Sequence, residues 1–409
     1  MTRSEISPGS SILPYKIDVA TARLDNIRDR VRAFRWDAWC EPADAGDWRY
    51  GPPIAFMREL CTYWLNHYDW RQQERAMNAS PQFITRIDEV DIHFIYERGS
   101  GSNPAPLLIA HGWPYSFHSY DGIVDQLAHP ERHGGRAEDA FSVVIPSYPG
   151  YDFSSRPQEP MEPLAIAFLF DKLIGRLEYD RYIVHGGDWG AHITSLLGFH
   201  LSDHVVGIHS TALVLREAGA QQLTGEVPND ASEEEQAFVA MEYAIWKREG
   251  AYSQLHATKP AKLSYAMMDS PVGLAAWIVE AFHAWSDRNK RSFAELFTFD
   301  QLLTEVMLYL VTDAFPTSIW IYGAAKRHEI TTLPPGQRVN VPTGLAAFPD
   351  PVFPMPPRQV AQRSHNVMQY TEMSSGGHFP FYEAPDLLIK DLRDFRKLVL
   401  PVVLNRTPS

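Results

Sequence analysis

The chain has 409 residues, of which 45% are hydrophobic, 12% aromatic and 21% charged. This length indicates a core domain with large additions, and the composition is that of a globular protein. The formal net charge is −13, from 37 basic and 50 acidic side chains. Such an acidic balance argues against nucleic acid or an anionic membrane surface as the main partner.

Cys40 and Cys61 are the two cysteines of the chain. Two are too few for a disulfide framework, so we expect a reduced, cytoplasmic setting. Residues 1–19 contain no apolar core of the kind that signal peptides carry, and the sequence has no run of about 20 apolar residues. We therefore expect neither a secretory signal nor a membrane anchor.

The chain begins with predicted helices. Residues 24–36 place apolar side chains three to four positions apart, and residues 56–78 form a second, aromatic-rich amphipathic pattern. The period then changes to that of strands. Residues 83–99 predict two short strands joined by a turn at Asp88-Glu89.

Short apolar runs then alternate with helical stretches. The runs cover residues 106–112, 142–150, 181–190 and 205–210. Continuous apolar runs at this spacing are typical of parallel strands buried on both faces, and ligands meet such a sheet at the ends of its strands. Strand-like runs return at residues 338–348 and 366–373, and a final helix is predicted over residues 384–399.

Between these two groups of strands lies a polar loop, 224–236, and a mostly helical segment from 234 to 305. A helical insertion between core strands is typical of a lid over an active site. The predicted fold class is α/β, with a mostly parallel central sheet flanked by helices. Its predicted segments are an N-terminal arm with a helical meander and the first strands (1–100), a first core part (101–225), a helical lid (226–315) and a second core part (316–409).

The sequence Gly-Gly-Asp-Trp-Gly, centred on Asp188, follows the strand-like run YIVH and precedes a helical stretch. Flanking glycines permit a sharp strand-to-helix turn that exposes the central side chain above the sheet. A carboxylate in this place suits attack on saturated carbon, such as that of an epoxide or a carbon–halogen bond. The alternative is an aspartate that only caps the following helix.

His111, Gly112, Trp113 and Pro114 follow the run PLLIA. Gly112 allows a tight turn, and the Trp113-Pro114 bond is a candidate for the cis form. The N–H groups of Trp113 and Trp189 can form an oxyanion hole for the carbonyl oxygen of the attacking carboxyl group. We expect His111, Gly112 and Pro114 to contribute to the substrate site. The alternative is an ordinary turn at a strand end.

His378 follows two glycines near the end of the chain, which fits the order nucleophile, acid, histidine. It is the candidate general base that activates water. Asp350 lies after the run 338–348 and is the candidate carboxylate that orients the base, with Glu372 as a weaker one. A solvated loop histidine and a turn-forming aspartate are the respective alternatives.

Together, the motifs HGWP, GGDWG and GGHF resemble the epoxide hydrolases of the α/β-hydrolase fold. Residues 63–83 resemble the N-terminal domain of the microsomal, juvenile-hormone and fungal branch, and residues 258–287 resemble its lid. The resemblance runs from about Leu13 to about Leu400.

The resemblance implies that Asp188 is the nucleophile and His378 the base. It also implies two lid tyrosines that bind the epoxide oxygen and donate a proton as the ring opens. Tyr252 matches the first by its context and Tyr322 the second, with Tyr265 as a fallback for Tyr252. A phenol is a suitable donor, because an alkoxide leaving group needs a proton at neutral pH.

The chain departs from the family at one position. The family places the orienting acid two residues after a Phe-Pro pair, here Phe348-Pro349, and this chain has Pro351 there. Either the loop shifts to present Asp350, or the acid is displaced or missing. The hydrolytic half of the reaction depends on which of these holds.

The predicted function is that of an epoxide hydrolase. It would convert an epoxide into a vicinal diol through an alkyl-enzyme ester on Asp188, which water activated by His378 hydrolyses. The alternatives are a dehalogenase with the same nucleophile and a binding protein that keeps the pocket without turnover. No metal or cofactor is predicted, and the expected partner is a small, bulky or apolar epoxide. Four aromatic residues of the lid are candidates for the lining of a hydrophobic pocket: Trp246, Trp277, Phe282 and Trp285. Resemblance further implies a homodimer.

Overall fold

The computed structural model describes residues 11–38, 46–217, 224–227, 229–328, 332–334 and 336–404, with the side chains of 401–404 left undescribed. Cys40 therefore lies outside the described residues. Cys61 is buried and has a free thiol. Within these ranges no single helix is long and apolar enough to cross a membrane, although the bent pair Phe299–Thr312 and Phe315–Arg327 meets the length and composition criteria together.

Nine strands of the described chain form one central sheet in the order β1-β2-β3-β5-β4-β6-β7-β10-β11. The strands from β1 to β5 pair antiparallel along one edge, whereas β5, β4, β6, β7, β10 and β11 run parallel. The strands are β1 (Leu13–Tyr15), β2 (Gln82–Ile87), β3 (Val90–Glu97), β4 (Ala105–Ala110), β5 (Phe141–Pro146), β6 (Tyr182–Gly186), β7 (Val205–Ser210), β10 (Val339–Ala347) and β11 (His365–Glu372).

The predicted strands are confirmed, because each apolar run of the sequence contains one of these strands. Asp88 and Glu89 form the turn between β2 and β3, and both have a positive φ, of 45° and 70°. β1 was not predicted, since three residues carry no recognisable period. The α/β class and the mostly parallel sheet are those that the sequence predicts.

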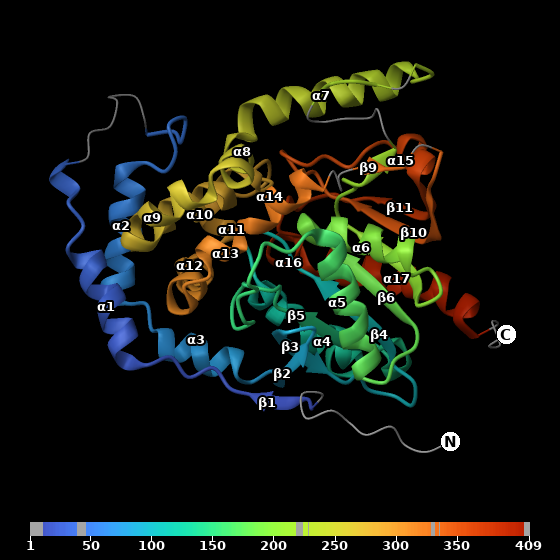
Figure 1. Cartoon of the computed structure of the whole chain (residues 1–409), viewed down its shortest axis with the longest axis horizontal. Coiled ribbons are helices and arrows are strands. Elements are labelled where there is room, and N and C mark those ends of the chain that lie inside the picture. Colours follow the sequence, from blue (N-terminus) through green and yellow to red (C-terminus); the bar gives the residue numbers. More distant parts are fainter. Residues whose placement is uncertain are drawn as a thin grey trace.

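Helices cover both faces of the sheet (Figure 1). One face packs against α5 and α6, and the other against α4 and α17. The bounds are α4 (Asp121–Ala128), α5 (Pro163–Arg176), α6 (Trp189–His200) and α17 (Pro385–Leu404), with the shorter η2 (Phe117–Tyr120), η3 (Pro130–His133), η4 (Ala137–Asp139), α15 (Arg358–Ser364) and α16 (Pro380–Glu383). The sheet is thus buried on both sides, as its continuous apolar strands require.

The segment between β7 and β10 is helical, as predicted. Two short strands, β8 (Arg216–Glu217) and β9 (Thr332–Leu333), pair with each other at its two ends. The helices are α7 (Glu233–Glu249), α8 (Ala251–Thr258), α9 (Pro260–Asp269), α10 (Pro271–Trp285), α11 (Phe293–Leu296), α12 (Phe299–Thr312), α13 (Phe315–Ser318) and α14 (Trp320–Arg327). Below, "lid" means α7 to α14.

The N-terminal arm holds α1 (Thr21–Arg32), the single 3-10 turn η1 (Trp36–Ala38), α2 (Ile54–Asn66) and α3 (Trp70–Met77). The single helix predicted over residues 56–78 is wrong, because the structure has two helices there. Asp69 begins a new helix after α2, because its side chain accepts a hydrogen bond from the Arg71 N–H and caps α3. The pattern Asp-Trp-Arg was a capping signal that apolar periodicity alone overlooks.

The arm packs against the lid. Helices α1 and α2 both contact α10 and α12, and Figure 1 shows the arm beside this part of the lid. Arg23 donates to the Leu310 carbonyl at 2.6 Å, and Arg30 donates to the Met268 carbonyl at 2.7 Å. These bonds occupy carbonyls at helix ends that otherwise need partners. The lid is thus held from the side opposite the sheet.

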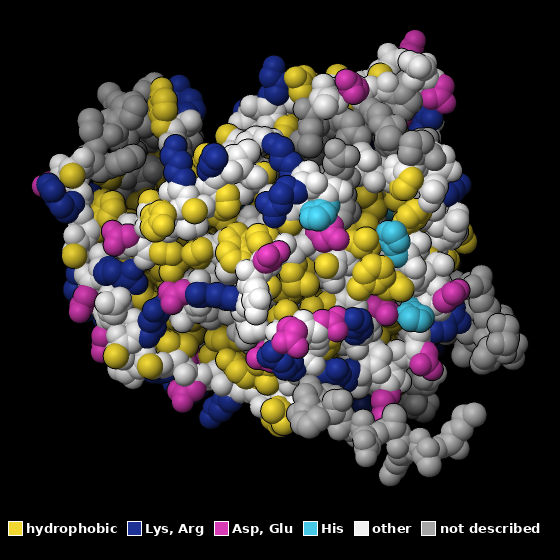
Figure 2. Space-filling view, in the orientation of Figure 1, with side chains coloured by type: hydrophobic (Ala, Val, Ile, Leu, Met, Phe, Trp, Pro, Cys, Tyr) yellow, Lys and Arg dark blue, Asp and Glu magenta, His cyan; other side chains and the backbone are white. Residues whose placement is uncertain are grey.

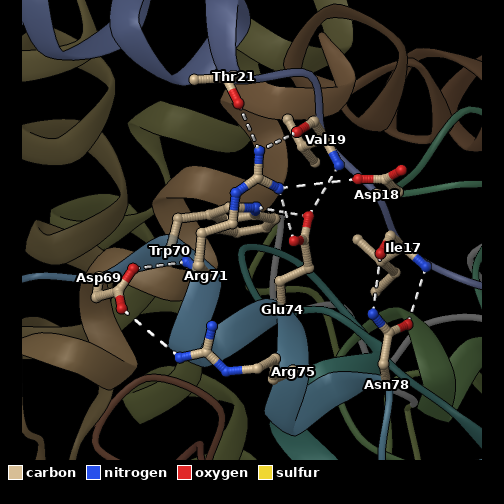
Figure 3. A network of polar contacts seen from close by, with 10 residues as sticks. All are labelled: Ile17, Asp18, Val19, Thr21, Asp69, Trp70, Arg71, Glu74, Arg75 and Asn78. Carbon is tan, nitrogen blue, oxygen red and sulfur yellow. Dashed lines mark hydrogen bonds and ion pairs between the residues drawn. The ribbon is translucent and has the colours of Figure 1, made fainter.

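A buried carboxylate fixes the start of the arm to α3 (Figure 3). Glu74 accepts hydrogen bonds from the Val19 N–H at 2.8 Å and from the Trp70 indole at 3.1 Å, and it pairs with Arg71 at 2.6 Å. Burial raises the pKa of Glu74, but these three contacts outweigh burial and lower it overall. The ionised carboxylate therefore stabilises the folded arm.

Glu74→Gln should lower the free energy of unfolding by about 2–3 kcal/mol at pH 7, because it leaves Arg71 without its buried partner. Denaturant unfolding measures this. A group with a lowered pKa contributes stability above its unfolded pKa and loses it as pH falls through the folded one. The difference between the two proteins should therefore shrink in acid. Glu59→Gln, at an exposed position of α2, is the control and should change little.

Candidate active site

Asp188 stands at the bend between β6 and α6. Its φ is 51° and its ψ is −125°, a conformation that side chains other than glycine rarely adopt. Its carboxylate makes no capping bond to α6. Instead, Oδ1 accepts a hydrogen bond from the Trp113 N–H at 2.9 Å. The alternative of a capping aspartate is therefore wrong, and the side chain points across the edge of the sheet.

Two glycines allow this bend to lie against the loop after β4. A Cβ on Gly190 would come within 2.0 Å of the Ala110 carbonyl oxygen. A Cβ on Gly112 would lie 2.6 Å from Asp188 Oδ1 and 2.7 Å from the Tyr115 hydroxyl. Only a residue without a side chain lets the two loops approach closely enough for the bond from the Trp113 N–H.

The loop with Gly112 is held by two phenols. The Tyr148 hydroxyl donates to the His111 carbonyl at 2.6 Å, and the Tyr309 hydroxyl donates to the Pro114 carbonyl at 3.0 Å. The Trp113-Pro114 bond is cis, as predicted. The His111 ring is fully buried, and burial lowers its pKa to about 4, so the ring is neutral.

His378 lies between two carboxylates. Its Nδ1 is 2.7 Å from Asp350 Oδ2, and its Nε2 is 3.6 Å from Asp188 Oδ2. Asp350 is itself fixed, because its Oδ1 accepts hydrogen bonds from the N–H groups of Val352 and Phe353. The loop thus presents Asp350 to the imidazole although the acid stands one residue earlier than in the family. Glu372, the weaker candidate, is exposed at the end of β11.

The charge of His378 follows from these neighbours. Burial lowers the pKa of His378, but the Asp350 carboxylate and the hydrogen-bonding and charge of Asp188 outweigh it and raise the pKa to about 10. The ring is therefore an imidazolium at neutral pH.

The two tyrosines of the lid face this group. Tyr252 on α8 stacks on Trp113, with ring centroids 5.5 Å apart, and lies 6.0 Å from the Tyr322 ring. Tyr322 on α14 is buried. Burial, with the charge of Asp188 added, raises the pKa of both phenols well above the usual value, so both keep their protons. The fallback Tyr265 is 82% exposed and lies on the outside of the lid.

Sequence reasoning missed His256, which packs between the two phenols. Its ring centroid is 4.8 Å from that of Tyr322 and 5.5 Å from that of Tyr252. Its Nε2 accepts a bond from the Trp277 indole at 3.3 Å, and burial lowers its pKa to about 3, so the proton of the neutral ring sits on Nδ1. The signal was available: His256 is four residues after Tyr252 on one helix face.

Trp189 and two nearby histidines pack around the bend. The Trp189 ring lies edge-on to Tyr322 at 4.9 Å and beside His192 at 5.0 Å. His185 is buried, and its Nδ1 contacts His209 Nδ1 at 2.9 Å. In the described parts of the chain, no three His, Cys, Asp or Glu side chains come together as a metal site requires.

A cavity of about 740 Å³ lies between the arm and the lid. Trp113, Tyr252 and Trp285 form its inner end, and the Trp285 ring is 5.0 Å from that of His378. Asp188 and His378 are not part of its lining, but two lining residues contact them: the Trp113 N–H bonds Asp188, and the Trp285 ring packs on that of His378. Of the other aromatic residues expected in the pocket, Trp277 lines it, whereas Phe282 is buried against Phe379.

These features define a class. A mostly parallel sheet carries an acid–base–carboxylate arrangement on the loops that follow β4, β6, β10 and β11, which is the arrangement of α/β-hydrolases. Comparison with known proteins agrees. The family described as "alpha/beta hydrolase fold" matches residues 105–320, and the family described as "Epoxide hydrolase N terminus" matches residues 12–120.

Individual similar proteins assign the chain to one family within this class. Epoxide hydrolase 1 of Sus scrofa is 33% identical, over 97% of this chain and 91% of the relative. Juvenile hormone epoxide hydrolase 1 of Ctenocephalides felis is 30% identical, over 93% and 85%. The structure of Aspergillus niger epoxide hydrolase superposes with a TM-score of 0.80 at 27% identity, over 95% of this chain and 97% of that one. The chain belongs to the α/β-hydrolase-fold epoxide hydrolases, in the microsomal, juvenile-hormone and fungal branch.

Gly112→Ala should reduce diol formation by at least about 100-fold, because the new methyl group displaces the carboxylate by a fraction of an ångström or more. Gly122→Ala on α4 is the matched control, since a Cβ there meets nothing within 4 Å. The two variants are compared by initial rates of diol formation and by thermal unfolding. Full activity in Gly112→Ala would show that the close approach of the two loops is unnecessary.

Proposed function

We propose that this epoxide hydrolase opens its substrate through an ester on Asp188 and hydrolyses the ester with water activated by His378. The proposal rests on the contacts that the two oxygens of the Asp188 carboxylate make. Asp188 Oδ1 accepts the Trp113 N–H, and Oδ2 lies 3.6 Å from His378 Nε2. One oxygen is thus held by a backbone donor while the other faces the binding side.

In the first step, Asp188 Oδ2 attacks an epoxide carbon, and the bond between that carbon and the ring oxygen breaks. The ring oxygen takes a proton from one of the two phenols, Tyr252 or Tyr322. Both phenols are protonated; Tyr252 lies at the inner end of the cavity, and the Tyr322 ring is 6.0 Å from it. The product is a hydroxyalkyl ester whose carbonyl oxygen is Oδ1.

In the second step, the His378 proton restores the phenol, and neutral His378 removes a proton from water that attacks the Asp188 carboxyl carbon. The negative charge that develops on Oδ1 meets the Trp113 N–H, with the Trp189 N–H as the second predicted donor. The bond between the carboxyl carbon and the ester oxygen breaks, and the proton that remains on the Asp188 carboxyl group passes to the departing alkoxide, which leaves as the diol. Asp188 is again ionised and His378 again protonated, so one epoxide and one water give one diol.

The change of charge on Asp188 makes this sequence workable. Two carboxylates raise the pKa of His378 in the free enzyme. Once Asp188 is an ester, only Asp350 remains, and the pKa of the imidazole falls. Alkylation therefore converts a protonated histidine into a base at the moment when a base is needed.

The cavity favours bulky or apolar epoxides. It lies between Trp36 and Met57 of the arm and Met267 and Trp277 of the lid, and it is wide enough for a molecule of drug size. The two phenols favour an oxygen leaving group over a halide, because a halide needs no proton.

The ester can be trapped. His378→Gln should accumulate it, because alkylation needs no base and hydrolysis does. The intact mass should rise by the mass of the epoxide, with the adduct on the peptide that contains Asp188. Asp188→Ala should form neither adduct nor diol, and His67→Gln, at an exposed position, should accumulate no ester. Diol formation by Asp188→Ala at the native rate would end the proposal.

The histidine should show two different titrations. In the free enzyme, NMR of labelled histidine should find His378 protonated up to a pH near its pKa of about 10. In single-turnover experiments, the rate of ester hydrolysis should rise with pH and level off at least about one unit lower, because one of the two carboxylates is neutral in the ester. Equal midpoints would mean that Asp188 does not set the charge of His378.

A further inference from the structure

One carboxylate on the wall of the cavity has no partner among the residues that the structure describes. Glu280 on α10 is half-buried and lines the cavity. Among the described residues it makes no hydrogen bond or ion pair, and its pKa is raised by burial and then by repulsion from Glu249. A carboxylate that has lost part of its water without gaining a donor is destabilising, and an arriving cation offsets that cost.

The nearby charges do not neutralise it. The cavity lining also contains Arg248 and Glu249, and these two pair with each other at 2.6 Å between Nε and Oε1. The three residues together leave one negative charge at this part of the wall. An apolar cavity with a single unbalanced charge is electrostatically suited to a cation.

Aromatic rings surround the same space. Trp277 precedes Glu280 by three residues, lies on the same face of α10 and lines the cavity, as Phe34 and Tyr50 of the arm do. The faces of indole rings attract ammonium groups, including alkylated ones, and this attraction adds to that of a carboxylate. Rings and a carboxylate in one cavity are the two elements that recognise an ammonium ion.

The position of Glu280 sets the minimum length of a substrate that reaches both Glu280 and Tyr252. Trp285, five residues further along α10, lies 5.1 Å from Tyr252 and 5.0 Å from His378 between ring centroids. Five residues of helix rise by about 7.5 Å, and the two side chains leave the helix about 140° apart, so a chain of at least about six carbon atoms is needed to join their positions. A substrate whose epoxide meets Tyr252 can therefore place its other end at Glu280.

We propose that Glu280 selects elongated, apolar epoxides that carry an ammonium group about six or more carbons from the ring. This rests on the proposed function, since it assumes that the epoxide reacts at Tyr252 and Asp188. It adds a charge-recognition site to a cavity that is otherwise apolar.

The test compares terminal epoxides of four to ten carbons that end in a trimethylammonium group with neutral analogues that end in a tert-butyl group. In the native enzyme, kcat/KM for the cation should exceed that for the neutral analogue at least tenfold at one or more chain lengths between six and ten carbons, through KM. Glu280→Gln should bring the ratio close to one. Glu234→Gln, at an exposed position of α7, removes the same charge outside the cavity and should keep the native ratio.

Calorimetry tests binding without catalysis. Hexyltrimethylammonium should bind the native protein at least tenfold more tightly than a neutral alkane alcohol of equal length, and this experiment needs no variant. A native ratio near one, or a preference that survives in Glu280→Gln, would overturn the role of Glu280. Failure to hydrolyse even the neutral epoxides would instead refute the proposed function.

Discussion

Asp188 adopts a positive φ at the point where β6 turns into α6, and this conformation costs on the order of 1–3 kcal/mol. The surrounding fold offsets that cost. Gly190 and Gly112 bring two loops close together, and the Trp113 N–H then bonds the carboxylate. The bend follows β6, which lies between the parallel strands β4 and β7 in a sheet that helices cover on both faces. It therefore has no room to relax. The strain holds a side chain that would otherwise fold back onto its own helix.

The same carboxylate controls the charge of its neighbour. His378 lies between Asp350 and Asp188, and each negative charge favours its protonated form. An imidazole in this position responds to the state of Asp188, since an ester carries no charge. The pair therefore behaves as one titrating unit with two states, and the proposed order of steps follows from electrostatics rather than from a movement of the chain.

Much of this arrangement could be predicted from the sequence, because strand ends in a parallel sheet meet at one edge. The apolar runs located β4, β6, β10 and β11, and glycines beside Asp188 and His378 marked the turns. Asp350 was identified as the nearest acid, but only the loop geometry shows that it reaches His378. The contact of His256 with both phenols and the isolation of Glu280 depend on how helices of the lid pack, which no local pattern encodes.

The cavity is walled mainly by two stretches of sequence that lie far apart in the chain, 34–57 and 248–285. Trp36 and Met57 come from the arm, Trp277 and Glu280 come from the lid, and of the groups proposed for the chemistry only Tyr252 lies on either stretch. Recombination within the family can therefore exchange an arm, and with it part of the cavity wall, while the proposed nucleophile stays in place. Substrate preference and reactivity can evolve as separately inherited traits in this architecture.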